Sequence, residues 1–173
     1  ALWEDYKSGG TRFKITAHTE NAALQPLLHP NYIGFPTTVS DQWRASHYLD
    51  DLAKFEKSGD MPAFSMILLP NDHTVGTRSG FPTPRAMVAD NDLALGRIVE
   101  GISHSKFWKD TLILVIEDDS QFGLDHVDGH RTVAFCVSPY TRRGAVVSEM
   151  YNHNSFARTI ELVLGLPPMT RFD

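Results

Sequence analysis

One stretch, residues 112–130, constrains the fold and the chemistry more than any other part of the chain. It begins with five apolar, largely β-branched residues, Leu112–Ile116, and then stops abruptly at the acidic triplet Glu117–Asp119. Such a run predicts a buried strand whose carboxyl end carries the acids. In open α/β sheets, ligands bind at that edge. The triplet is therefore where a binding site is expected.

The same stretch continues with residue types that bind metal ions. Asp125, His126, Asp128 and His130 follow the triplet, so one strand end and one loop gather five carboxylates and two imidazoles. Carboxylates packed together repel each other unless protons or a cation lie among them. A divalent metal such as Zn, Mn or Fe is the simplest physical explanation, because these ions accept both oxygen and imidazole ligands.

A second apolar run ends in similar residues. Phe64–Leu69 lies between two prolines and predicts another buried strand, which Asn71, Asp72 and His73 follow closely. In a parallel sheet both strand ends meet at one edge. Two histidines with two or three aspartates from these separate segments then fit a metal site. A metal held there could polarise a phosphoryl oxygen or activate a bound water, which is hydrolytic chemistry.

The remaining patterns predict helices and one further strand. The expected boundaries are a helix from Ser40 or Asp41 to Gly59, a helix that begins at Thr83–Pro84, a strand over Thr132–Val137, and a helix capped by Asn154 and stopped by Gly165. Together they predict an α/β layered domain with a mostly parallel sheet. Its length suits a single domain over residues 1–173.

Composition limits the classes of function. The net charge of -5, without a stripe of Lys and Arg, argues against nucleic-acid binding. Nothing resembles a transmembrane segment or a signal peptide, and the first residue is Ala, so we expect a trimmed chain or a fragment. Cys136 is the single cysteine and lies in an apolar run, which predicts a buried thiol.

Each candidate residue also has a structural interpretation. Asp118 and Asp119 could form an Asx turn or cap a helix, His73 could cap a neighbouring helix, and the loop acids and histidines could be a solvated surface. For most of these residues taken singly, the structural interpretation is favoured. Because they gather at one edge of the expected sheet, a metal site is favoured for the group as a whole. Five other histidines are assigned to surface or packing roles, namely His18, His29, His47, His104 and His153.

Several separate motifs carry a resemblance to a known family. They are Leu69–Thr74, Thr83–Pro84, Ala89–Asp92, Ser103–Ser105 with Trp108, Glu117–Asp119, Asp125–Asp128 with His130–Arg131, and Leu164–Pro168. In this order they resemble the bacterial phosphoesterase family of the alkaline-phosphatase superfamily, which includes phospholipases C and acid phosphatases. The resemblance implies a three-layer α/β/α sandwich with metal ligands and a phosphate site at the carboxyl edge of the sheet.

The resemblance also implies roles for individual residues. Asp118 and Asp119 match the paired acidic position, and His73 matches the histidine after the preceding strand. Asp72, His126 and His130 complete the implied metal set, and His73, His126 and His130 are the implied catalytic histidines. A phosphate ester is the implied substrate, and an exported or periplasmic location is expected.

One part of the family pattern is not found in the sequence. Members carry an upstream acidic-amide metal motif and a Ser or Thr nucleophile, and residues 1–39 offer no candidate for either. The expected fold is therefore incomplete at its N-terminus, and the chain corresponds to the carboxyl-terminal portion of such an enzyme.

Three functions remain open from the sequence. The first is a metal-dependent hydrolase of phosphoric esters that lacks its nucleophile in this chain. The second is a non-catalytic metal- or anion-binding segment that completes a sheet with a missing N-terminal part or a partner chain. The third is a sulfatase or a phosphate-transferring mutase on the same scaffold.

Overall fold

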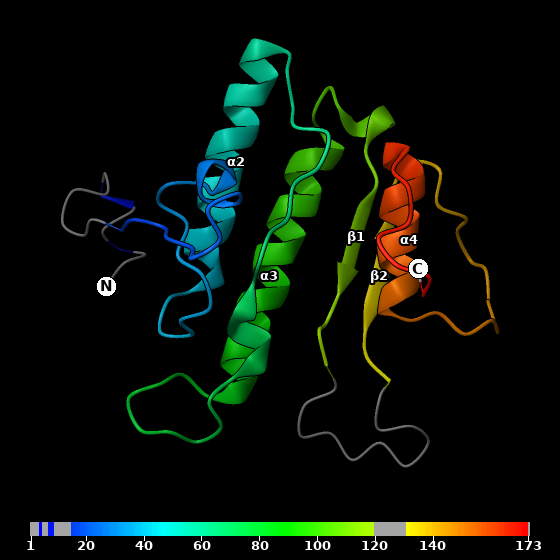
Figure 1. The fold of residues 1–173 in the computed structure, drawn as a ribbon. Coiled ribbons are helices and arrows are strands. Elements are labelled where there is room, and N and C mark those ends of the chain that lie inside the picture. The colour runs from blue at the N-terminus through cyan, green and yellow to red at the C-terminus, as the bar shows by residue number, and fades with distance from the viewer. Residues whose placement is uncertain (1–3, 5–6, 9–14, 120–130, 173) are drawn as a thin grey trace. The chain divides into compact units, whose positions relative to one another are not determined.

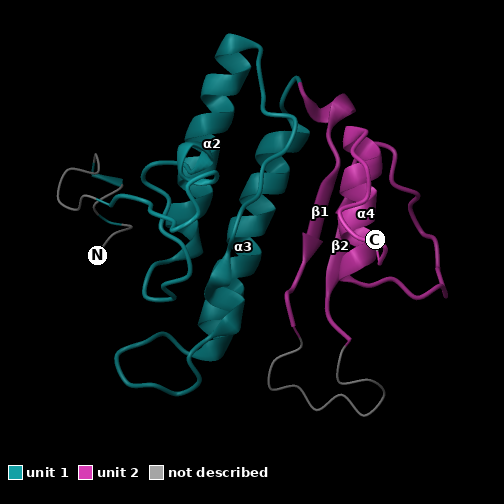
Figure 2. Cartoon of the chain, viewed as in Figure 1, with its two compact units in different colours: residues 1–106 teal, residues 107–173 magenta. Residues whose placement is uncertain are grey.

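The computed structural model describes residues 4, 7–8, 15–119 and 131–172 of the 173-residue chain. Its elements, in chain order, are the 3-10 helix η1 (Gln25–Leu27), α2 (Asp41–Ser58), η2 (Pro70–His73), α3 (Pro84–Ser103), η3 (Trp108–Asp110), β1 (Ile113–Ile116), β2 (Ala134–Val137) and α4 (His153–Leu164) (Figure 1). They fall into two compact units, residues 1–106 and residues 107–173 (Figure 2). Asp72 and His73 belong to unit 1, whereas Asp118 and Asp119 belong to unit 2.

Unit 1 is built on helices α2 and α3, which lie side by side and run in the same direction (Figure 1). Arg97 of α3 donates hydrogen bonds to the first turns of α2, to the backbone oxygen of Gln42 at 3.1 Å and to the hydroxyl of Ser46 at 3.0 Å. The buried apolar side chains between and around the helices are Val39, Trp43, Ala45, Leu52, Met87, Ala94, Ile98 and Ile102. Their removal from water is the main force that holds the two helices together.

The ends of these helices follow the signals expected from the sequence. The side chain of Ser40 accepts a hydrogen bond from the N–H of Gln42 at the start of α2, and Gly59 ends that helix with a φ of 84°. Thr83 caps α3 in the same way, through the N–H of Ala86, and Pro84 is its first residue. Side-chain oxygens satisfy N–H groups that have no partner inside the helix. The predicted boundaries of both helices are confirmed.

Unit 2 contains a two-stranded sheet and helix α4. β1 and β2 pair antiparallel, with Ile113 opposite Val137 and Ile116 opposite Ala134. Helix α4 ends at Gly165, as predicted, but its N-cap is Asn152, which forms a reciprocal capping box with Ser155, and not Asn154. Asn152 is in extended geometry whereas Asn154 is already helical, and only an extended residue can turn its side chain back onto the first N–H groups.

Helix α4 is anchored by a buried carboxylate. Glu161 is 3% exposed, and its side chain accepts a hydrogen bond from Arg158 at 3.0 Å. It also accepts one from the backbone N–H of Met169 at 2.8 Å. These bonds compensate for the loss of water around the carboxylate and fasten the segment after α4 to the helix.

The structure supports a mixture of helices and strands, but it corrects the expected sheet. The described part of the chain contains one sheet, and its two strands are antiparallel rather than parallel. The expected strand over Phe64–Leu69 does not form; this segment runs without a ladder partner into η2, with Phe64 53% and Met66 89% exposed. An apolar run becomes a strand only where another strand accepts its backbone hydrogen bonds.

Two further observations concern exposure. Cys136, which was expected to be buried, is exposed, since it lies on β2, whose first three residues are exposed. Of the helices described, none combines the length and apolar character that a membrane span requires.

Candidate functional site

The paired acids lie at the carboxyl end of β1, as the sequence predicts. Both Asp118 and Asp119 are exposed, and Oδ1 of Asp118 accepts a hydrogen bond from the backbone N–H of Asp119 at 3.0 Å. No described residue donates a hydrogen bond to the side chain of Asp119. Two adjacent carboxylates with accessible oxygens suit a hard divalent cation.

The backbone at this strand end is held from several sides. The side chain of Glu117 accepts a hydrogen bond from the hydroxyl of Thr132 at 2.5 Å, and its backbone N–H donates to the carbonyl of Val133 at 3.2 Å. The carbonyl of Glu117 lies 2.9 Å from Nε2 of His153, and because a carbonyl can only accept, that nitrogen carries the hydrogen. Glu117 and His153 therefore have structural roles, whereas the two aspartates that follow project into solvent.

Unit 1 carries two more of the predicted ligands, Asp72 and His73, on the short helix η2. Asp72 is partly buried and His73 is exposed. Nδ1 of His73 lies 3.0 Å from the carbonyl of Thr74, and because a carbonyl can only accept, this nitrogen carries the hydrogen of that contact. Phe35 packs edge-on against the imidazole at 5.2 Å between ring centroids. Histidine that ligates a metal is commonly oriented by a hydrogen bond of this kind.

The residue after His73 has an unusual backbone. Thr74 has a φ of 55° and a ψ of -173°, and it is the one non-glycine residue with positive φ in the described chain. Such conformations cost free energy and persist where the surroundings impose them, often at functional sites. The strained residue, Thr74, directly follows Asp72 and His73.

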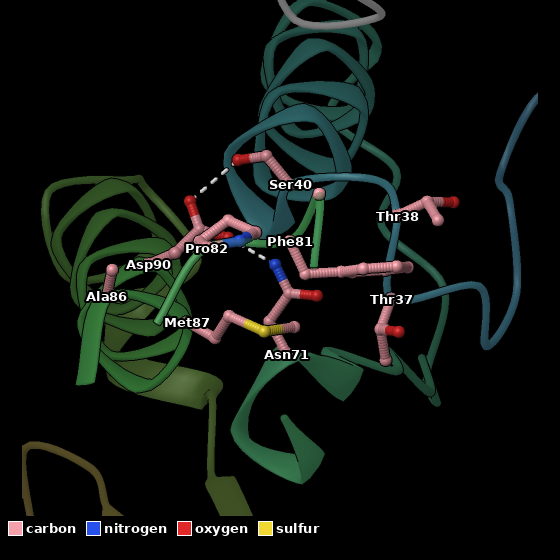
Figure 3. A pocket seen from close by; sticks show the side chains of 10 residues that line it. Thr37, Thr38, Ser40, Asn71, Phe81, Pro82, Ala86, Met87 and Asp90 are labelled. Atoms are coloured by element: carbon pink, nitrogen blue, oxygen red, sulfur yellow. Dashed lines mark hydrogen bonds between the residues drawn. The ribbon is translucent and has the colours of Figure 1, made fainter. Parts of the chain in front are cut away.

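A buried polar network fastens η2 to the first turns of α2 and the first half of α3. Asn71 donates from its backbone N–H to Oδ2 of Asp41 at 3.0 Å and from its side chain to Oδ2 of Asp90 at 2.6 Å (Figure 3). Asn91 donates to the carbonyl of Leu69 at 2.7 Å and to Oδ2 of Asp41 at 3.1 Å. Asp90 and Asn91 thus determine where η2 lies, although neither is a candidate ligand.

Asp41 is the centre of this network and is fully buried. It forms an ion pair with Arg44 at 3.0 Å, and both side chains have no exposed surface. Burial raises the pKa of Asp41, while the N–H of Asn71 and the guanidinium of Arg44 act in the opposite direction. Arg44 also donates to the carbonyls of Ile33, Gly34, Pro36 and Val39. A buried ion pair is tolerated when its remaining donors are satisfied in this way.

The structure describes four of the six predicted ligands, as two pairs. Asp72 and His73 lie together on η2, and Asp118 and Asp119 lie together after β1. His126 and His130, with the neighbouring Asp125 and Asp128, lie outside the described residues. Among the residues that are described, no three His, Cys, Asp or Glu side chains are arranged to hold a metal ion.

Sequence reasoning missed the network that supports η2. The sequence does show two unusual features here, a polar residue, Asn91, among the apolar positions of α3, and acids at positions 90 and 92 that lie too far into the helix to cap it. Nothing in the sequence indicated that Arg44 would be buried, because long charged side chains are rarely buried.

Comparison with known proteins identifies the family. The model of the Phosphoesterase family matches residues 3–167 of the chain. No curated protein and no solved structure shows significant similarity to this chain. The chain belongs to the Phosphoesterase family, and this membership supports hydrolysis of phosphate esters as its general activity.

Proposed function

We propose that this protein is a metal-dependent hydrolase of phosphoric esters, of the phosphatase or phospholipase C type. In this proposal Asp118 and Asp119 are metal ligands, together with Asp72, His73, His126 and His130. The histidines His73, His126 and His130 also act on the substrate, by transferring protons or by contacting the phosphoryl group. The bound metal, which we expect to be Zn, Mn or Fe, would polarise the phosphoryl oxygen or lower the pKa of a bound water.

The observation that carries the proposal is the pair Asp118 and Asp119 in a chain of this family. The two carboxylates follow a strand whose end is held by Glu117, and both face solvent. The donor set fits the group, because carboxylate oxygens together with imidazole nitrogens bind Zn, Mn and Fe. Residues 1–39 supply no nucleophile in this proposal.

Hydrolysis of p-nitrophenyl phosphate and binding of Mn²⁺ test the proposal together. We expect turnover that requires Mn²⁺ or Zn²⁺, and we expect Asp118→Asn to lower kcat/KM by about 100-fold or more, because a neutral amide is a poorer ligand than a carboxylate. The same substitution should weaken Mn²⁺ binding, as measured by water-proton relaxation. This second measurement separates a loss of the metal from a loss of chemistry.

Glu149→Gln is the matched control, because Glu149 is an exposed carboxylate of the same unit that lies outside the proposed ligand set. It should leave both Mn²⁺ binding and turnover unchanged. Equal turnover by Asp118→Asn and the wild type, or turnover that persists in a chelator, would refute the metal-dependent mechanism.

A second candidate function is a non-catalytic metal- or anion-binding segment that completes a sheet with a partner chain. It is favoured by the sheet of unit 2, where β1 has β2 as its neighbour and Val133 and Phe135 are 51% and 49% exposed. Exposed strand edges and apolar faces are typical of surfaces that other chains cover. Native mass spectrometry that detects a stable assembly, without metal-dependent turnover, would support this function over the first.

A further inference from the structure

A pocket of about 480 Å³ opens in unit 1 beside the first turns of α2 and α3. Its polar wall includes Asn71 of η2, Asp90 of α3 and the hydroxyl residues Thr37 and Thr38 (Figure 3). Its apolar wall includes Phe81 and Met87. Small-molecule sites typically have this composition, with an apolar lining and a few polar groups that orient the ligand. We infer that this pocket binds a small organic ammonium compound.

One side-chain oxygen of the pocket wall is a hydrogen-bond acceptor without a partner. Asn71 is 4% exposed, and its side-chain oxygen Oδ1 is buried without any hydrogen-bond partner. The amide cannot simply be turned over, because its nitrogen donates to the carboxylate of Asp90 at 2.6 Å. In Figure 3 the oxygen points away from Asp90, toward the side that Phe81 covers. A buried acceptor of this kind is destabilising unless a donor occupies the space before it.

The pocket wall carries a negative charge on Asp90. Asp90 accepts hydrogen bonds from the hydroxyl of Ser40 at 2.6 Å and from the N–H of Asp41 at 2.7 Å, so it acts as a carboxylate. It forms no salt bridge with a described residue, and the described lining contains no Lys, Arg or His. Asp90 is the charged residue among the residues that line the pocket, and its negative charge favours a cation over an anion. The pocket is therefore unlike a site for the phosphoryl group.

Phe81, Pro82 and Met87 form the apolar part of the lining and suit the alkyl part of such a ligand. A ligand with a charged N–H donor and a short alkyl chain satisfies Asn71, Asp90 and this apolar surface at once. The inference does not depend on the proposed hydrolase activity.

Titration of isotope-labelled protein with n-butylammonium chloride tests the inference by NMR. We expect the side-chain amide of Asn71 and the backbone amides of Gly80 and Phe81 to shift as the salt is added up to about 10 mM, which detects binding in the millimolar range. n-Butanol should bind at least about tenfold more weakly, since it lacks the charge, and butyrate should not bind. Sodium chloride controls for ionic strength.

Two alanines of α3 provide a matched pair of variants. Ala86 lines the pocket and Ala89 does not, and both are exposed. Ala86→Leu should fill the pocket and weaken n-butylammonium binding at least about tenfold, whereas Ala89→Leu should leave it unchanged. Leucine is a good helix former, so both variants should fold. Equal affinity for n-butanol, no shifts with n-butylammonium, or unaltered binding by Ala86→Leu would each overturn the inference.

Discussion

His47 shows how one residue of α2 makes unit 1 sensitive to pH. Its ring packs against Trp43 at 4.2 Å and against His29 at 5.2 Å between centroids. Burial lowers the pKa of His47, and the neighbouring His29 lowers it further, while Asp50 and Asp51 act in the opposite direction. The folded state therefore holds a proton on this imidazole less tightly than the unfolded state does.

From this we predict a loss of stability on acidification. A base whose pKa is lowered by folding contributes stability above its unfolded pKa, about 6.5, and this contribution disappears as the pH falls through the folded value. The free energy of unfolding in urea should therefore decrease between about pH 7.5 and pH 5.5, and His47→Gln should decrease less. His18→Gln, at an exposed histidine of the same unit, should behave as the wild type. Equal decreases in all three proteins would contradict the prediction.

At the scale of elements, the contact between α2 and α3 depends on glycine at one position and not at another. A Cβ added at Gly101 would lie 2.5 Å from Cδ2 of Leu49 and 3.5 Å from Cδ2 of Leu52, both on α2. A Cβ added at Gly96 would meet nothing within 4 Å. Both glycines lie inside α3, where glycine is less favourable than alanine.

Two substitutions should therefore have different effects on stability. Gly96→Ala should raise the free energy of unfolding by about 0.5–1 kcal/mol, through the gain in helix propensity alone. Gly101→Ala should gain the same helix propensity, but the contact of the new Cβ with Leu49 should cancel this gain in stability, because overpacking typically costs about 1–3 kcal/mol. Urea denaturation of the two variants measures the difference. A Gly101→Ala protein as stable as Gly96→Ala would show that Leu49 moves aside without cost.

At the scale of the whole molecule, apolar burial is unevenly distributed. All eight buried apolar residues of the described chain lie in unit 1, on or beside α2 and α3. In unit 2 the residues of β1 are partly buried and those of β2 are mostly exposed. Among the described residues of this unit, Glu161 is the buried one, and it is charged. Elements with little buried apolar surface open at lower free energy than the core does.

We therefore predict that the two units exchange amide hydrogens at different rates. Hydrogen exchange of the intact protein, followed by mass spectrometry, should show the central amides of α2 and α3 as the most protected. The amides of β1, β2 and α4 should exchange at least about tenfold faster. Equal protection of β1 and of α3 would show that the units unfold together.

How well the fold could be predicted depended on the range of the interactions. The ends of α2, α3 and α4 at Gly59, Thr83 and Gly165 were predicted correctly, because capping involves residues within one turn. The strand over Phe64–Leu69 was wrong, since a strand depends on a partner that is distant in sequence. Burial along α3 also depends on distant contacts, since Ile98 and Ile102 are buried whereas the apolar Val88 is 47% exposed.

The candidate site could also be predicted only in part. Its residue types and their positions after apolar runs could be read from the sequence, and Asp118 and Asp119 do follow a strand. The support of η2 could not, because a polar Asn91 inside a helix does not show that its partners are Asp41 and Leu69, which are 50 and 22 positions away.

The sequence alone determined the local structure and the chemistry of this protein: the helix caps, the acidic strand end and the motifs that identify a phosphoesterase. Only the tertiary structure decided that β1 and β2 are antiparallel, that Asp41 and Arg44 are buried together, and that Asn71 has an oxygen without a partner. The physical reason is that capping and hydrophobic period act over a few residues. Strand pairing and the burial of polar groups depend instead on which distant residues arrive at the same place.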